Sequence, residues 1–269
     1  MEFYGLIGEK LGHSLSPQIH QMYFSLTGKE GAYRLLEIPP EKLSLLPEAI
    51  RLFRFRGLNV TIPYKQAILP YLDEIDPLAR EAGAVNTLCL QGDRLVGYNT
   101  DVLGLSRALL RMGVSLSGAK ATVLGSGGAA KAAVLVLLKG GAREITVVSR
   151  QPEGRTHPDP RVRFSGYDAP LAGDLLINAT PVGMFPHAGY TPVGAEVLSR
   201  FDALMDLIYN PEETEFLRLG REMGKNVSNG LYMLIEQALA SEEIWQGEPV
   251  PEGICEAIGR ALREGGLSR

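Results

Sequence analysis

The sequence has 269 residues, of which 45% are hydrophobic and 22% are charged, and its formal net charge is −4. This length and composition allow one large domain or two ordinary ones with buried cores, and they exclude a wholly disordered chain. The negative net charge argues against nucleic acid or an anionic membrane as the main partner, but a local basic group can still bind a small anionic ligand.

Cys89 and Cys255 are the only cysteines, and they show neither CxxC nor Cys/His spacing. We therefore expect no disulfide framework, no metal site and a reducing compartment. The N-terminal segment MEFYGLIGEK lacks a basic leader with a long apolar run, and apolar runs such as 132–138 are shorter than the roughly 20 residues of a membrane span. These features predict a cytoplasmic protein.

Short apolar runs alternate with helical patterns along the chain, as in α/β proteins. In the first hundred residues FYGLIG, AYRLLEI and GLNVTI read as strands, and residues 16–26, 41–54 and 65–72 read as helices. NTLCLQ and RLVGYN flank Gly92-Asp93, a two-residue hairpin signal, which makes the first sheet mixed rather than purely parallel.

After residue 100 the pattern becomes that of a doubly wound parallel sheet. A helix over 101–112 ends at Gly113, and the strands expected after it are 119–124, 144–149, 175–179, 203–207 and 226–228. Residues 151–168 read as a surface loop, and residues 231–263 as two helices broken near Pro249 and Pro251. We expect an N-terminal α/β domain with a mixed sheet, followed by a Rossmann-type domain, with the join near 99–101.

The segment ATVLGSGGAAKAA is the strongest local motif. A strand runs into Gly125, Ser126, Gly127, Gly128 and Ala129, and then into a helix of small residues. Such a loop lets backbone N–H groups approach a pyrophosphate at a helix N-terminus. An ordinary glycine-rich turn is the alternative, because a GxGxxG pattern is weak outside this strand–loop–helix context.

The end of the next strand reads Ser149-Arg150, where an NAD site usually carries an acidic residue. An arginine binds a phosphate with a forked geometry, so the pattern favours NADP. Taken alone, Arg150 is more typical of a solvated charge at a strand end.

Polar side chains gather at strand ends of the first domain. Ser16 fits a helix N-cap before Pro17, which leaves Ser14 as a second hydroxyl able to hold a carboxylate. In GLNVTIPYK, the residues Leu58, Val60 and Ile62 share one face of a strand, whereas Asn59 and Thr61 share the other and Lys65 follows. Each polar group has a simpler interpretation as part of a solvated edge.

Two further polar segments carry candidate residues. Asn86 follows a glycine turn, and Asp101 precedes a helix, where an N-cap is its default interpretation. Tyr209 and Gln237 are not distinguished by any local pattern, and the four histidines are assigned surface or core roles.

Together these segments resemble the shikimate dehydrogenase family over nearly the whole chain. The matching stretches, in the family's order and spacing, are SLSPQIH, NVTIPYK, GAVNTL, GYNTD, LGSGGAAKA, NATPVGM, DLIYNP and NGLYMLIEQA. The resemblance implies reversible reduction of 3-dehydroshikimate to shikimate with NADPH, in aromatic amino-acid biosynthesis. It also implies a substrate domain of residues 1–100 joined by C-terminal helices (238–269), an NADP-binding domain of residues 101–237, and a cleft between them.

The resemblance assigns residues to three roles. Lys65 and Asp101 are the implied catalytic pair, with Lys65 as acid and base and Asp101 orienting it. The implied substrate-binding residues are Ser14, Ser16, Asn59, Thr61, Lys65, Asn86, Asp101, Tyr209 and Gln237. The implied NADP-binding residues are Gly125, Ser126, Gly127, Gly128, Ala129, Ser149, Arg150, Thr180, Leu207 and Gly230. We leave a homodimer open as the assembly.

Two positions depart from the family pattern. Ser149-Arg150-Gln151 replaces Asn-Arg-Thr, and Tyr232 stands where many relatives have a small residue; it would line the nicotinamide pocket or the domain seam. The rival interpretations are a quinate/shikimate dehydrogenase, a folate-type methylene dehydrogenase, which fits SLSP and the Gln237 region poorly, and a non-catalytic NADP-binding regulator. Retention of both Lys65 and Asp101 argues against the regulator.

Overall fold

The computed structural model describes residues 1–12 and 14–265, which fold as two compact units. The first unit contains Met1–Gly104 and Ile235–Ala261, and the second contains Leu105–Leu234 and the described residues from Leu262. All three boundaries fall inside helices: α5 (Thr100–Arg111), α9 (Leu231–Gln246) and α10 (Ile254–Glu264). The α/β fold class is confirmed, whereas the expected assignment of substrate and cofactor to the two parts of the chain stays a prediction.

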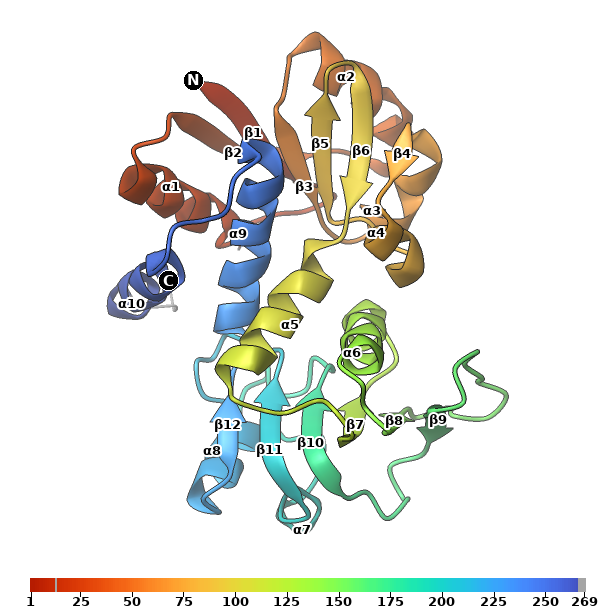
Figure 1. Ribbon diagram of the computed structural model, residues 1–269. Coiled ribbons are helices and arrows are strands. Elements are labelled where there is room, and N and C mark those ends of the chain that lie inside the picture. Colours follow the sequence, from red (N-terminus) through yellow and green to blue (C-terminus); the bar gives the residue numbers. More distant parts are fainter. Residues whose placement is uncertain (13, 266–269) are drawn as a thin grey trace. The chain divides into compact units, whose positions relative to one another are not determined.

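The first unit is built on a mixed six-stranded sheet with the order β2-β1-β3-β5-β6-β4 (Figure 1). The strands are β1 (Glu2–Gly8), β2 (Gly31–Glu37), β3 (Gly57–Val60), β4 (Glu74–Ile75), β5 (Thr87–Gln91) and β6 (Arg94–Tyr98). β3 pairs parallel with β1 and antiparallel with β5, and the expected hairpin joins β5 to β6. The helical segments are α1 (Ser16–Thr27), η1 (Pro40–Leu45), α2 (Leu46–Leu52), α3 (Tyr64–Ala67), η2 (Leu69–Tyr71), α4 (Pro77–Ala82), the start of α5, most of α9, and most of α10 (Ile254–Glu264).

Alternation along β3 gives this sheet two different faces. Leu58 and Val60 pack with Ile50 of α2 in an apolar core cluster. Gly57 and Asn59 lie on the opposite face, against Trp245 and Ser241 of α9. Thus Asn59, the polar residue within β3, lies under the helix that returns from the C-terminal end of the chain.

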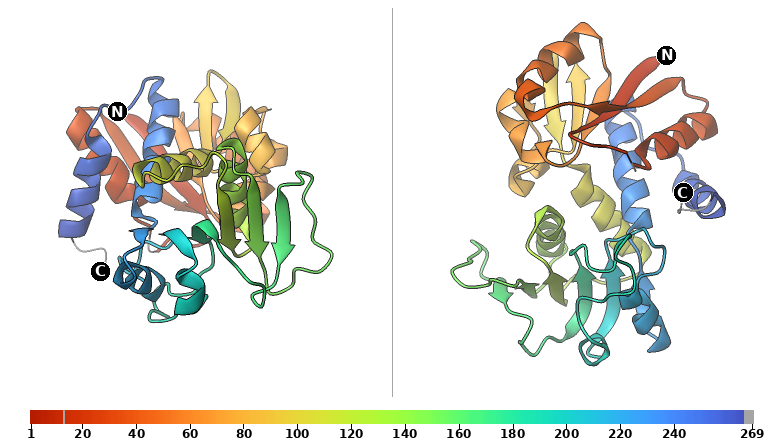
Figure 2. Two further views of the ribbon diagram at one scale, coloured as in Figure 1. Left: turned by 60° about the horizontal axis from the view of Figure 1, so that its bottom comes forward. Right: turned by 180° about the vertical axis from the view of Figure 1, so that it is seen from behind.

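The second unit is built on a parallel six-stranded sheet with the order β12-β11-β10-β7-β8-β9 (Figure 2). The strands are β7 (Lys120–Leu124), β8 (Glu144–Val148), β9 (Val162–Ser165), β10 (Gly173–Asn178), β11 (Phe201–Asp206) and β12 (Asn226–Ser228). Its helices include α6 (Gly128–Lys139), α7 (Ala195–Leu198) and α8 (Glu215–Glu222). The strand order reverses between β7 and β10, which is the position where doubly wound sheets bind ligands.

Three local expectations were wrong. Residues 151–168 contain strand β9, a four-residue edge strand in which Val162 is buried and Arg163 is exposed. The expected helices over 41–54 and 65–72 each contain a 3₁₀ segment, η1 and η2. Ile62 is not a core residue: the Tyr64 N–H donates to Thr61 O, and at this turn Ile62 is 77% exposed.

Within the described ranges, no helix is long and apolar enough to cross a bilayer. Across residues 1–12 and 14–265, no three His, Cys, Asp or Glu side chains gather in a way that could hold a metal ion. Both cysteines are buried free thiols.

Candidate active site

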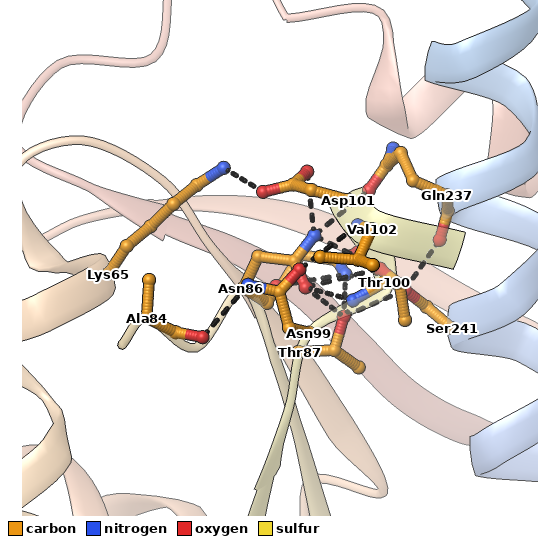
Figure 3. Close-up of polar contacts among 11 residues, drawn as sticks. Lys65, Ala84, Asn86, Thr87, Asn99, Thr100, Asp101, Val102, Gln237 and Ser241 are labelled. Carbon is orange, nitrogen blue, oxygen red and sulfur yellow. Dashed lines mark hydrogen bonds and ion pairs between the residues drawn. The ribbon is translucent and has the colours of Figure 1, made fainter. Parts of the chain in front are cut away.

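The first unit brings Lys65 and Asp101 into direct contact. Lys65 Nζ lies 2.6 Å from Asp101 Oδ2 (Figure 3). Lys65 is on the short helix α3 and Asp101 is in the first turn of α5, so the pair joins segments 36 residues apart. Their side chains are 31% and 21% exposed. The pair is therefore partly shielded from water and still open to a ligand.

Asp101 is free to pair because another residue caps α5. The Val102 N–H donates to Asn99 Oδ1 at 3.1 Å, which is an N-cap contact. Asn99 Nδ2 in turn donates to the Ala84 carbonyl at 2.9 Å, which anchors the cap. The default interpretation of Asp101 as the N-cap was wrong.

Asn86 holds the other oxygen of the Asp101 carboxylate. Its Nδ2 donates to Asp101 Oδ1 at 2.9 Å and to Thr100 Oγ1 at 3.0 Å. The Thr100 N–H donates to Asn86 Oδ1 at 2.6 Å, which fixes the orientation of the amide because a backbone N–H can only donate. Gln237 Oε1 lies 3.5 Å from Asn86 Nδ2, so four candidate residues share one patch of the first unit (Figure 3).

Asn59 is engaged by protein groups at both ends of its amide. It is 5% exposed, and its Nδ2 lies 2.9 Å from Ser241 Oγ and 3.1 Å from Thr87 Oγ1. Its Oδ1 accepts from the Tyr33 hydroxyl at 2.8 Å. Contact with a substrate stays a prediction for Asn59 and for Thr61, which is half-buried just after β3.

The paired serines lie at the start of α1, but the N-cap of this helix differs from the expectation. Ser16 is the first residue of the helix, Leu15 is at the N-cap, and the Ser16 N–H donates to Ser14 Oγ at 3.2 Å. The N-cap interpretation of Ser16 was therefore wrong. The two hydroxyls are 3.1 Å apart. Burial raises the pKa of Tyr33 well above its usual range, and a hydrogen bond with Ser16 opposes that rise.

The glycine loop of the second unit opens α6. Gly125 has φ 104°, which favours glycine, and a Cβ there would meet the Ala179 carbonyl oxygen at 3.0 Å. Gly127 is the N-cap of α6, and a Cβ added at Gly127 or Gly128 would meet nothing within 4 Å. The start of α6 is therefore accessible to a phosphate, and no acidic residue occupies its first turn.

The end of β8 carries the other expected cofactor residues. Ser149 is 6% exposed, and its Oγ accepts the Gln151 N–H at 3.3 Å, so it shapes the turn. Arg150, the next residue, is exposed. An open loop at a helix N-terminus and an exposed guanidinium fit the pyrophosphate and the 2′-phosphate of NADP.

The ends of β10 and β11 share a buried polar network. Thr180 Oγ1 donates to Asn178 Oδ1 at 2.7 Å, and Asn178 Nδ2 donates to Asp206 Oδ1 at 3.0 Å. Burial raises the pKa of Asp206 to about 6, although Thr214, Ile208 and Asn178 all donate to its carboxylate.

Three further candidates follow this network in the second unit. A Cβ on Gly230 would lie 2.2 Å from the Leu207 carbonyl oxygen, so these two expected cofactor residues are adjacent. Burial raises the pKa of Tyr209, whose substrate contact stays a prediction. The Tyr232 ring has the guanidinium carbons of Arg111 and Arg263 at 4.4 and 5.2 Å from its centroid.

Sequence reasoning missed five residues that carry the hydrogen-bond networks inside the two units: Thr87, Thr100 and Ser241 in the first, and Asn178 and Asp206 in the second. Four of them lie within the family-like stretches GAVNTL, GYNTD, NATPVGM and DLIYNP, beside residues already noted. Ser241 has no local signal, because its importance comes only from the contact of α9 with the sheet.

The fold and these two sites define a class: dinucleotide-dependent dehydrogenases built from two α/β units. A family model described as the substrate-binding domain of shikimate dehydrogenase matches residues 6–88. The NADP(+)-type shikimate dehydrogenase of Clostridium beijerinckii is 47% identical over 249 residues, covering 91% of this chain and 92% of that protein.

Solved structures agree with this relationship. A chorismate mutase/shikimate 5-dehydrogenase fusion protein from Clostridium acetobutylicum has a TM-score of 0.94 at 44% identity, with 98% of each chain covered. A shikimate 5-dehydrogenase from Thermus thermophilus, solved in complex with NADP(H) and shikimate, has a TM-score of 0.85 at 35% identity, covering 97% of this chain and 100% of that one. The chain belongs to the shikimate dehydrogenase family.

Proposed function

We infer that this chain is an NADP-dependent shikimate dehydrogenase, which reversibly reduces 3-dehydroshikimate to shikimate in aromatic amino-acid biosynthesis. The observation that carries the inference is the 2.6 Å contact between Lys65 Nζ and Asp101 Oδ2, in a chain that also has a dinucleotide loop. The names of relatives at up to 47% identity support the same substrate and cofactor.

Reduction of a ketone needs a proton donor and a positive charge at the carbonyl oxygen. When bound, NADPH supplies the hydride to the carbonyl carbon. The Lys65 ammonium then stabilises the alkoxide and gives it a proton, and a neutral Lys65 takes that proton back in the reverse direction. Asp101 holds Lys65 Nζ, and Asn86 holds the second Asp101 oxygen, so the ammonium has a defined position.

The remaining first-unit candidates are proposed to bind the substrate. Ser14 and Ser16 supply hydroxyls for its carboxylate, and Thr61, Asn86 and Gln237 surround its ring and the ring hydroxyls. Asn59 acts by holding its neighbours, because its own amide is engaged by Ser241, Thr87 and Tyr33. Tyr209 of the second unit completes the proposed set.

In the second unit, residues 125–129 are proposed to bind the pyrophosphate. Arg150, with Ser149 shaping its turn, is proposed to bind the 2′-phosphate. Thr180, Leu207 and Gly230 are proposed to line the nicotinamide side of the site. The two buried free cysteines support a reducing, cytoplasmic location, and a homodimer stays open as the assembly.

The test is oxidation of shikimate with NADP, followed by NADPH absorbance, in the wild type, Lys65→Ala and Lys42→Ala. Loss of the acid–base group should lower kcat of Lys65→Ala by roughly 10²- to 10⁴-fold with little change in KM. Lys42 is an exposed lysine on η1 and serves as the control for loss of one positive charge. An unchanged kcat in Lys65→Ala would contradict the assignment of Lys65 as the acid–base group. A higher kcat/KM with quinate than with shikimate would contradict shikimate as the substrate.

A further inference from the structure

Three buried hydroxyls lie between the candidate active-site residues. Thr87 of β5, Thr100 of α5 and Ser241 of α9 each have 0% relative exposure. Thr87 Oγ1 lies 2.9 Å from Ser241 Oγ and 3.1 Å from Thr100 Oγ1 (Figure 3). Hydroxyls buried this deeply are retained only where their hydrogen bonds are made.

The donor and acceptor roles of the three hydroxyls follow from one fixed acceptor. Ser241 Oγ lies 3.0 Å from the Gln237 backbone carbonyl, which can only accept, so the Ser241 hydrogen points there. Thr87 then donates to Ser241, and Thr100 donates to Thr87. Asn86 Nδ2 donates to Thr100 Oγ1, and its second hydrogen goes to Asp101 Oδ1. This assignment gives each hydroxyl hydrogen one acceptor.

Asn59 donates to two members of the cluster, Thr87 and Ser241, and Thr87 lies between Ser241 and Thr100 in the chain of hydrogen bonds. Asn59 Nδ2 lies 3.1 Å from Thr87 Oγ1 and 2.9 Å from Ser241 Oγ. Without the Thr87 hydroxyl, Thr100 loses its acceptor at 3.1 Å and is left with Ser241 Oγ and Asn86 Oδ1, both at 3.2 Å. Ser241 loses a donor, and Asn59 loses one of its acceptors. Thr100 can then turn toward Asn86 Oδ1, which lies 3.2 Å away, and compete for the amide that holds Asp101.

We propose that the Thr87 hydroxyl is a positioning group for the Lys65–Asp101 pair, acting through Thr100 and Asn86, with Ser241 of α9 as the anchor of the chain of hydrogen bonds. The proposal rests on the proposed function of Lys65 and Asp101. It gives α9 a role in acid–base chemistry, because the anchor hydroxyl comes from a helix distant in sequence from the pair.

A matched pair of variants tests the proposal. Thr87→Val keeps the shape of the side chain and removes the hydroxyl, whereas Thr87→Ser keeps the hydroxyl and removes a methyl group. Thr87→Val should lower kcat roughly 10- to 100-fold, the range for a displaced catalytic group, and leave KM for NADP at the wild-type value. Thr87→Ser should restore most of that loss. The amount of folded enzyme is counted by NADPH-binding stoichiometry.

The outcomes separate this inference from the proposed function. A wild-type kcat in Thr87→Val, or an equal loss in Thr87→Ser, overturns the positioning role. If Thr87→Val does not fold, Ser241→Ala removes the anchor oxygen alone and is judged by the same fall in kcat. An inactive Lys65→Ala beside a fully active Thr87→Val overturns only this inference, whereas an active Lys65→Ala overturns the proposed function itself.

Discussion

The position of Asp101 depends on which neighbouring side chain caps α5. Asn99 accepts the Val102 N–H and leaves the Asp101 carboxylate for Lys65 and Asn86. Asn and Asp are nearly equivalent as N-caps, so residue type alone could not distinguish Asn99 from Asp101. The role of each residue follows from where the first helical turn begins.

The buried carboxyl group of Asp206 makes the free energy of unfolding depend on pH. Burial raises its pKa to about 6 from 3.8, so the folded state keeps a proton that the unfolded chain releases near pH 4. Its contribution to stability is therefore complete below about pH 4 and is lost as pH rises through about 6. By pH 7 the loss is roughly 3 kcal/mol, because a tenfold change in proton affinity corresponds to about 1.4 kcal/mol.

Asp206→Asn should remove this dependence. Between about pH 4 and 7, urea unfolding should show the wild type losing up to roughly 3 kcal/mol relative to the variant. Asp202→Asn on the same strand controls for the loss of one negative charge. Parallel stability curves for the wild type and Asp206→Asn would show that Asp206 titrates normally.

At the level of elements, one face of α9 connects the core of the first unit to the site. Gln237, Ser241 and Trp245 recur every four residues and therefore lie along one face of the helix. Trp245 is fully buried, and its Nε1 donates to the Leu88 carbonyl at 2.8 Å. The indole thus sets the register of α9, which places Ser241 over Asn59 and Gln237 near Asn86.

Gly57 is the position where this packing can be broken. A Cβ at Gly57 would lie 1.9 Å from Trp245 Nε1, so Gly57→Ala forces the indole and α9 away from the sheet. We expect a loss of about 3 kcal/mol or more in the free energy of unfolding, together with a lower kcat. Denaturant unfolding and the shikimate assay measure the two effects.

Gly194→Ala is the matched control, because its Cβ would meet only Glu196 Cγ, at 4.0 Å. It should unfold close to the wild type. A Gly57→Ala protein as stable as Gly194→Ala would contradict the proposed register of α9.

At the scale of the whole molecule, the first unit is discontinuous in sequence. Residues 235–261 supply buried side chains such as Ile235, Leu239 and Trp245 to a unit whose sheet comes entirely from residues 1–104. The isolated segment 1–104 would expose the face of the sheet on which Tyr4 contacts Trp245. A small α/β segment that loses this burial should not fold cooperatively.

This expectation can be tested with two fragments. Residues 1–104 alone should show no cooperative urea transition by circular dichroism. The same residues joined by a flexible Gly/Ser linker to 235–261 should regain one. A cooperative transition in the shorter fragment would show that the C-terminal helices are dispensable for the first unit.

By itself, the sequence determined the two α/β patterns, the glycine loop and the identity of most candidate site residues. The element pattern and the glycine loop follow from local period and turn chemistry, which need no knowledge of distant contacts. The roles expected of most candidate site residues come from the resemblance of short stretches to the shikimate dehydrogenase family. The tertiary structure shows the contact expected between Lys65 and Asp101, and it alone decided that Asn59 faces α9 and that Thr87, Thr100 and Ser241 share hydrogen bonds. Such pairings join residues up to 182 positions apart, and only the packing of α9 on the sheet brings them within hydrogen-bond distance.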